Sequence, residues 1–114
     1  MKFKLSIFLS LALLASACYS AQQWCTGVIR HTYINKQGNL YIFGDWRNEH
    51  TQICNLNSLW QGVEPEVCKG WLSIALAAKL SGAKVTVQYN DVASCSEVPR
   101  YETAPSPSYI MVTE

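Results

Sequence analysis

Residues 63–89, VEPEVCKGWLSIALAAKLSGAKVTVQY, decide the fold because two hydrophobic periods meet within them. Apolar side chains first recur at spacings of three and four, which is the period of a helix with an apolar face. Pro65 suits the first helical turn, and Gly82 can supply a left-handed cap. The pattern predicts a helix over Glu66 to Ser81. Strict alternation then predicts a strand over Ala83 to Tyr89.

Three segments before this helix and one near the end of the chain also alternate in the manner of strands. They are Cys25 to Ile34, Asn39 to Trp46, Thr51 to Leu56 and Tyr109 to Thr113. An unbroken alternation places Ile29, His31 and Tyr33 on one face of the first strand. Residues 90–107 are rich in Ser, Pro, Asp and Glu, and they predict a long loop.

The resulting order, β-β-β-α-β-β, predicts an α+β, mainly β, domain. Five antiparallel strands with one helix between the third and fourth have the connectivity of the OB fold. We therefore expect a five-stranded antiparallel OB-like barrel, although a generic α+β roll fits the same order. The helix has few polar residues, and this predicts that more than one of its sides is covered.

Residues 1–20 predict a secretory signal peptide, which leaves residues 21–114 as a single domain. Two lysines lie within Met1 to Lys4, an apolar and serine-containing run follows, and small residues end it. The run is about half of the roughly 20 residues that a transmembrane helix needs, so we expect no membrane insertion after cleavage. We expect a periplasmic or secreted protein. Cleavage after Ala17 instead of Ser20 would leave Cys18 at the new N-terminus, the position that is acylated in lipoproteins.

Composition and charge exclude several classes of function. A charged fraction of 15%, with four tryptophans and six tyrosines, excludes a disordered chain. Cleavage after Ser20 leaves seven Lys and Arg against eight Asp and Glu, so we expect no nucleic-acid partner. His31 and His50 lie at no metal-ligand spacing from a cysteine, and no cofactor motif is present, so we expect neither a metal nor a cofactor. These two histidines are the only candidate bases of that type, and we expect no enzyme.

Four cysteines remain after cleavage, and an even number in an exported chain predicts disulfides. Four cysteines allow three pairings. Cys54 on the third strand and Cys68 in the first helical turn would close a loop of about 15 residues. Cys25 would then pair with Cys95. We expect the pairs Cys54–Cys68 and Cys25–Cys95.

The connection between the second and third strands carries the most suggestive group of side chains. The candidate ligand-binding residues are Asp45, Trp46, Arg47, Asn48, His50 and Trp60. A planar ring stacks on the apolar face of a sugar while fixed polar groups bond its hydroxyls, and Trp and Arg are also enriched at protein-interface hot spots. In the alternative interpretation, Trp46 and Trp60 fill the ends of the barrel, and Asp45 and Arg47 pair on the surface.

Several motifs run along the mature chain: Cys25-x-Gly27, Trp46-Arg47, Thr51-x-x-Cys54-Asn55, Trp60-x-Gly62-Val63-x-Pro65-Glu66-x-Cys68-Lys69-x-Trp71, Cys95-Ser96, and Ala104-Pro105-x-Pro107-x-Tyr109-x-Met111. Together they resemble a group of short, uncharacterised secreted proteins of marine and enteric gamma-proteobacteria, and this resemblance implies no established activity. In strand order and secretion alone, the chain is also similar to the B subunits of AB5 toxins, OB-fold proteins that form rings and bind host glycans. That likeness implies a homo-oligomer in which the helix carrying Trp71 and Leu76 faces a pore or a partner.

These observations predict a small exported binding domain that recognises a glycan or another protein, as a toxin B subunit does. The alternative is a periplasmic inhibitor or immunity-like protein that blocks an enzyme. A single protein partner in a pull-down would favour the inhibitor, and a signal on a glycan array would favour the glycan-binding domain.

Overall fold

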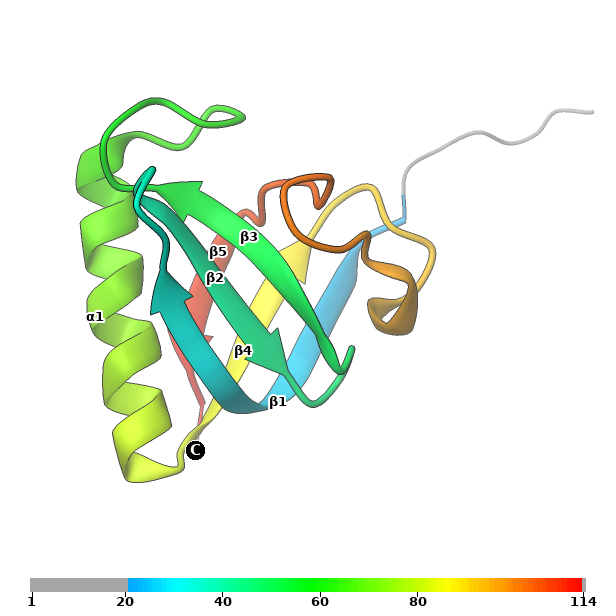
Figure 1. Cartoon of the computed structure of the whole chain (residues 1–114). Coiled ribbons are helices and arrows are strands. Elements are labelled where there is room, and N and C mark those ends of the chain that lie inside the picture. Colours follow the sequence, from blue (N-terminus) through cyan, green and yellow to red (C-terminus); the bar gives the residue numbers. More distant parts are fainter. Residues whose placement is uncertain (1–20, 114) are drawn as a thin grey trace, which may run out of the picture.

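A computed structural model describes residues 21–113, and both the predicted signal peptide and Cys18 lie outside them. The elements in chain order are β1 (Gln23–Ile34), β2 (Asn39–Gly44), β3 (Glu49–Asn55), α1 (Pro65–Ser81), β4 (Lys84–Tyr89), the short 3-10 helix η1 (Cys95–Glu97) and β5 (Tyr109–Val112). The strands form one antiparallel sheet in the order β3-β2-β1-β4-β5, with α1 along one side (Figure 1). The predicted α+β, mainly β, class and the helix between the third and fourth strands are confirmed.

The sheet does not close into a barrel within residues 21–113. Closure would pair the edge strands β3 and β5, and no such ladder is present there. Residues 98–107, which we call the strap, lie against the edge of β3 instead (Figure 1). The N–H of Tyr101 donates to the carbonyl of His50 at 2.6 Å, and the N–H of Gln52 donates to the carbonyl of Tyr101 at 3.1 Å. The antiparallel five-stranded sheet is therefore confirmed, whereas the barrel is not, because the strap occupies an edge that closure would use.

A β-bulge at Arg30 divides β1 between the two halves of the sheet. The N-terminal half of β1 pairs with β4 and the C-terminal half pairs with β2, with a register shift between Ile29 and His31. The extra residue leaves Arg30 and His31 both exposed, while Ile29 is buried in the core. The prediction that Ile29 shares a face with His31 and Tyr33 was wrong, because a bulge resets the alternation of side chains along a strand.

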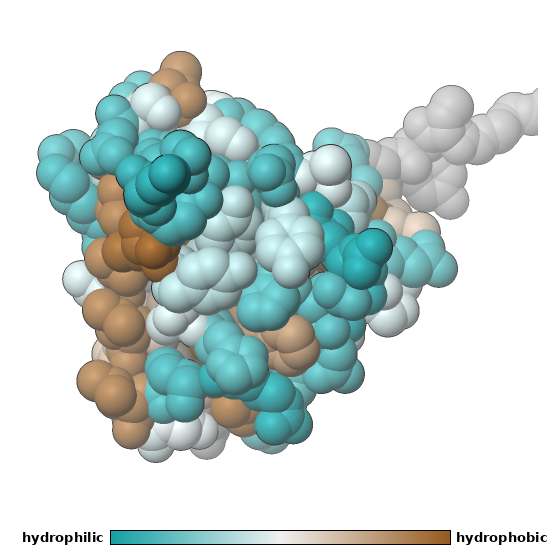
Figure 2. Space-filling model, in the orientation of Figure 1, coloured by the Kyte–Doolittle hydropathy of each residue, from teal (hydrophilic) through white to brown (hydrophobic). Residues whose placement is uncertain are grey.

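Helix α1 begins and ends close to where its cap residues predict. Pro65 occupies the first turn, and Gly82 adopts a φ of 75° with its N–H bonded to the carbonyl of Ala78 at 2.9 Å. The residues of its buried face are Cys68, Trp71, Ala75 and Ala78. Within the described chain the other side is open, since Leu76 and Leu80 are 43% and 86% exposed. Figure 2 shows the apolar stripe along α1. The expectation that more than one side of the helix is covered was wrong for the single chain, because small alanines let one narrow face pack closely on the sheet.

The hydrophobic core lies between the curved sheet and α1, and both predicted disulfides border it. The Cα atoms are 5.6 Å apart in Cys25–Cys95 and 5.5 Å apart in Cys54–Cys68. The first bond ties the segment before the strap to β1, and the second ties the start of α1 to β3. Disulfides persist in oxidising compartments, so they indicate an environment outside the cytoplasm.

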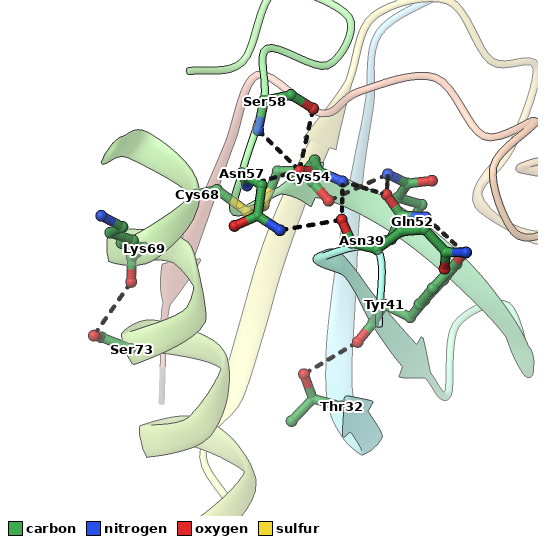
Figure 3. The surroundings of a disulfide bond; sticks show 12 residues. Thr32, Asn39, Tyr41, Gln52, Cys54, Asn57, Ser58, Cys68, Lys69 and Ser73 are labelled. Atoms are coloured by element: carbon green, nitrogen blue, oxygen red, sulfur yellow. Dashed lines mark hydrogen bonds between the residues drawn. A yellow bond between two sulfur atoms is a disulfide. The ribbon is translucent and has the colours of Figure 1, made fainter. Parts of the chain in front are cut away.

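Amide side chains form a hydrogen-bonded network around Cys54–Cys68 (Figure 3). The Oδ1 atom of Asn39 accepts hydrogen bonds from Gln52 Nε2 at 2.8 Å and from Asn55 Nδ2 at 2.6 Å. The Oδ1 atom of Asn55 accepts the backbone N–H groups of Asn57 and Ser58 at 2.7 and 2.9 Å. These bonds fix the path of the chain as it leaves β3 toward α1.

Tyr89 is the largest fully buried side chain. Within residues 21–113 its hydroxyl has no hydrogen-bond partner, and the hydroxyl of the nearby Thr51 donates to the carbonyl of Ile42 instead. Burial raises the pKa of Tyr89 to about 12, and the proximity of Thr51 offsets only part of that rise. The phenol therefore stays neutral in the folded protein at any physiological pH.

Candidate functional site

The turn between β2 and β3 is held by its own polar side chains. The Oδ1 atom of Asp45 accepts the N–H of Val28 at 3.1 Å, and the N–H of Asp45 donates to the carbonyl of Val28 at 3.0 Å. Arg47 Nε donates to the carbonyl of Val98 in the strap at 2.6 Å. Asp45 and Arg47 therefore bind the main chain of two other segments rather than one another.

Trp46 packs its ring over two glycines. A Cβ atom on Gly44 would overlap the six-membered part of the indole, and a Cβ atom on Gly27 would meet the same ring and the Asp45 carboxylate. Trp46 is half-buried and contacts the core. Because only glycine leaves room for the indole at both positions, Trp46 fixes the turn to the sheet.

The structure brings most of the predicted site residues to one end of β3 but places Trp60 at the other. Asn48 is exposed in the turn with a φ of 58°, and His50 follows on the first residues of β3. Trp60 lies in the loop between β3 and α1, at the opposite end of the strand (Figure 1), where its main chain pairs with that of Val63. Trp60 therefore does not share a site with the turn.

His50 lies at the centre of a group of rings on the outer side of β1, β2 and β3. We call this group the aromatic cluster; its members are His31, Tyr33, Tyr41, Phe43, His50 and Tyr101. The ring of Tyr101 stacks on that of His50 with centroids 5.6 Å apart, and Phe43 meets His50 edge-on at 4.8 Å. These separations are those of attractive aromatic pairs. The cluster is a packed surface of rings, with Tyr33 and Tyr101 38% and 44% exposed.

Tyr101 is held in a backbone conformation that a bulky residue rarely adopts. Its φ is 53°, in the left-handed region that favours glycine. The two main-chain hydrogen bonds to β3 fix this conformation and place the ring on His50. Such a conformation costs on the order of 1 kcal/mol or more, and conformations of this kind concentrate at functional sites.

An open pocket of about 420 Å³ lies beside the aromatic cluster, between β1 and the C-terminal half of α1. Its lining residues are Arg30, His31, Thr32, Tyr33, His50, Leu76, Lys79 and Leu80. One wall therefore carries rings and the bulge of β1, and the other carries apolar and basic side chains of α1. A pocket with apolar walls and a few polar groups is the usual form of a small-ligand site.

The lining of the pocket includes two positive side chains and no negative one, while Glu102 lies outside it but close enough to Tyr33 to raise the pKa of that hydroxyl. Arg30 and Lys79 are both exposed, neither forms an ion pair within residues 21–113, and no Asp or Glu belongs to the lining. Glu49, which precedes His50 on β3, forms an ion pair with Arg100 at 3.6 Å, so its charge is offset.

Two polar groups of the cluster complete its chemistry. Partial burial, and then the neighbouring Tyr101 and Tyr41, raise the pKa of Tyr33, so its hydroxyl remains a neutral hydrogen-bond donor at neutral pH. Glu102 adds to that rise more weakly. The Nδ1 atom of His50 is buried and has no hydrogen-bond partner in the described chain. Buried polar atoms usually have a hydrogen-bond partner, so an imidazole nitrogen without one is an uncommon feature at the centre of the cluster.

No group of three or more His, Cys, Asp or Glu side chains in the described chain has the arrangement of a metal site. Among the same residues, no helix has both the length and the apolar character needed to cross a membrane.

Protein-family models, curated proteins and solved structures were compared with the chain, and none matches it. The two resemblances described above therefore stay predictions.

Sequence reasoning named only His50 among the members of the aromatic cluster. His31 and Tyr33 were assigned to the face that carries Ile29, and the bulge at Arg30 separates them from it. Tyr101 comes from a segment with no periodic pattern. The sequence did contain one signal for the cluster. In the predicted hairpin, Tyr33 lies opposite Tyr41 and His31 lies opposite Phe43, and such pairs of rings across two strands stabilise each other.

Proposed function

We propose that this chain is a small exported binding domain that recognises a glycan at the aromatic cluster and the adjoining pocket. The observation that carries the proposal is the pocket of about 420 Å³ beside partly exposed rings. A sugar has apolar faces edged by hydroxyl groups. Tyrosine and histidine rings offer a flat apolar surface with a polar group at the rim, which matches both parts of a sugar.

The strained backbone of Tyr101 supports the same site. A fold that needed only a strap residue to cover β3 would be served by glycine or asparagine at this φ. A tyrosine there stacks on His50 and presents a ring that is 44% exposed. The energetic cost is consistent with a position used for recognition.

The site residues predicted from the sequence divide into one at the proposed binding surface and several that hold this surface in place. His50 is at the binding surface, next to the pocket. Asp45, Trp46 and Arg47 support that surface, because they tie the β2–β3 turn to β1 and to the strap that carries Tyr101. Asn48 is exposed at the rim of the turn, and Trp60 lies outside the proposed site. Export to the periplasm or beyond agrees with the two disulfides.

Binding to a glycan array by purified residues 21–114 tests the proposal. Tyr33→Ala removes an exposed ring and should lower the apparent affinity roughly tenfold, the value of one aromatic contact. Trp24→Ala is the matched control, because Trp24 is 55% exposed on the other half of the sheet and bonds only Tyr109 through its indole N–H. Thermal melts would verify that both variants fold.

Two outcomes would contradict the proposal. Equal loss of binding in both variants would mean that the aromatic cluster is not the site. An array without signal, together with stoichiometric capture of one envelope enzyme, would select the inhibitor function instead.

A further inference from the structure

We infer that the pocket takes a sugar that carries a carboxylate, in preference to its neutral counterpart. This inference rests on the proposed glycan-binding function and specifies the class of ligand. It is carried by the arrangement of charge around the pocket, where Arg30 and Lys79 approach from two different elements and no acidic side chain lines the space between them.

The bulge in β1 is what brings Arg30 to the pocket. In a regular strand Arg30 and His31 would project to opposite faces, whereas here both are exposed and both line the pocket. Bulges re-aim side chains in this way and are frequent next to functional sites. The guanidinium has no ion-pair partner in the described chain, and its planar fork matches a carboxylate.

Lys79 supplies the second positive charge from the last turn of α1. It is exposed and, like Arg30, forms no ion pair within residues 21–113. Its positive charge at the C-terminal end of the helix also interacts favourably with the helix dipole. This is a small effect on stability and is separate from binding.

The rest of the lining suits the body of a sugar. Tyr33 and His31 lie on the β1 side, and Leu76 with Leu80 lies on the α1 side. A sugar ring seated between these apolar walls would direct an attached carboxylate toward the two cations. A neutral sugar would make the same apolar contacts and would gain nothing from Arg30 and Lys79.

The experiment compares pairs of immobilised glycans that differ only in the acid group. The pairs are oligosaccharides ending in glucuronic acid or in glucose, and sialyllactose with its carboxylate free or converted to the neutral amide. The wild-type domain should bind the acidic member of a pair about tenfold more tightly, the ratio given by one charge-assisted hydrogen bond. Arg30→Gln and Lys79→Gln should each reduce that preference severalfold.

Lys36→Gln and Lys84→Gln are matched controls, because each removes one exposed positive charge outside the pocket. They should keep the preference for acidic glycans. An equal loss in the controls would overturn the inference, since the preference would then come from net charge. Equal binding of acidic and neutral members by the wild type would overturn it as well, while leaving glycan binding established. Absence of binding to every glycan would instead refute the proposed function.

Discussion

The two disulfides should contribute unequally to stability, in an order set by the length of chain that each one closes. Their sequence separations are 14 for Cys54–Cys68 and 70 for Cys25–Cys95. The entropy removed from the unfolded chain gives about 3 kcal/mol for the shorter loop and about 4.4 kcal/mol for the longer one. Replacing Cys25 and Cys95 together by alanine should therefore destabilise the domain by about 1.4 kcal/mol more than replacing Cys54 and Cys68.

Urea unfolding followed by tryptophan fluorescence measures the difference. With an m-value of about 1.5 kcal/mol/M, the midpoint should fall by about 2 M without Cys54–Cys68 and by about 3 M without Cys25–Cys95. The wild type under reducing conditions should be less stable than either variant. Equal midpoints, or a lower midpoint without Cys54–Cys68, would refute the argument from loop length and would assign the larger effect to packing around α1. If one variant is unfolded in water, it should be the one without Cys25–Cys95.

Three further predictions concern single residues. Gly44→Ala should cost about 2 kcal/mol, because the new methyl group would displace the Trp46 indole, and thermal unfolding should show a fall in Tm of roughly 10 °C. Gly70→Ala is the contrasting change, since Gly70 is exposed on α1 with open space around it, and it should raise stability by about 1 kcal/mol; a lower Tm would count against the helix geometry. The third prediction is a dependence on alkaline pH. Folding raises the pKa of Tyr89 from 10.0 to about 12. The stability that comes from keeping the phenol neutral is therefore fully present below pH 10 and is lost as the pH rises through 12, by about 3 kcal/mol of unfolding free energy in total. Tyr89→Phe should remove most of that slope in denaturant titrations between pH 9 and pH 12, with a smaller part left by Tyr33, whose pKa is also raised; an unchanged slope would show that another group causes it.

The elements that the sequence predicted well are those whose signals are local. Helix α1 is marked by its period of three and four, by Pro65 at its start and by Gly82 after its end. The Cys54–Cys68 disulfide was predicted because it closes a short loop between β3 and the start of α1, and Cys25–Cys95 followed as the remaining pair. Strand and helix limits differ from the predicted ones by one or two residues. β2, for example, ends at Gly44 rather than at Trp46, because the Trp46 ring folds back over that glycine.

The aromatic cluster depends on features that a hydrophobic pattern does not report. One extra residue at Arg30 changes the face on which His31 and Tyr33 lie, and nothing in the alternation of β1 signals it. Tyr101 reaches His50 only because the strap runs along β3 and takes the edge with which β5 would pair in a closed barrel. Tertiary packing, and not a local pattern, decides which of the two segments lies at that edge. The polar residues of the β2–β3 turn were easier to identify from the sequence. In the structure, however, Asp45 and Arg47 hydrogen-bond to main-chain groups of Val28 and Val98.

An open sheet presents two edge strands whose unpaired N–H and C=O groups recruit strands from other molecules, which is a common route to aggregation. The strap blocks one of these edges, because Tyr101 occupies the hydrogen-bonding groups of His50 and Gln52 on β3. Its prolines, Pro99, Pro105 and Pro107, have no N–H with which to extend the pairing to a second molecule. The other edge, β5, is only 4 residues long, and short edges recruit poorly. Since Cys95 is bonded to Cys25 just ahead of the strap, oxidation also keeps this protection in place, and a reduced chain should self-associate more readily than an oxidised one.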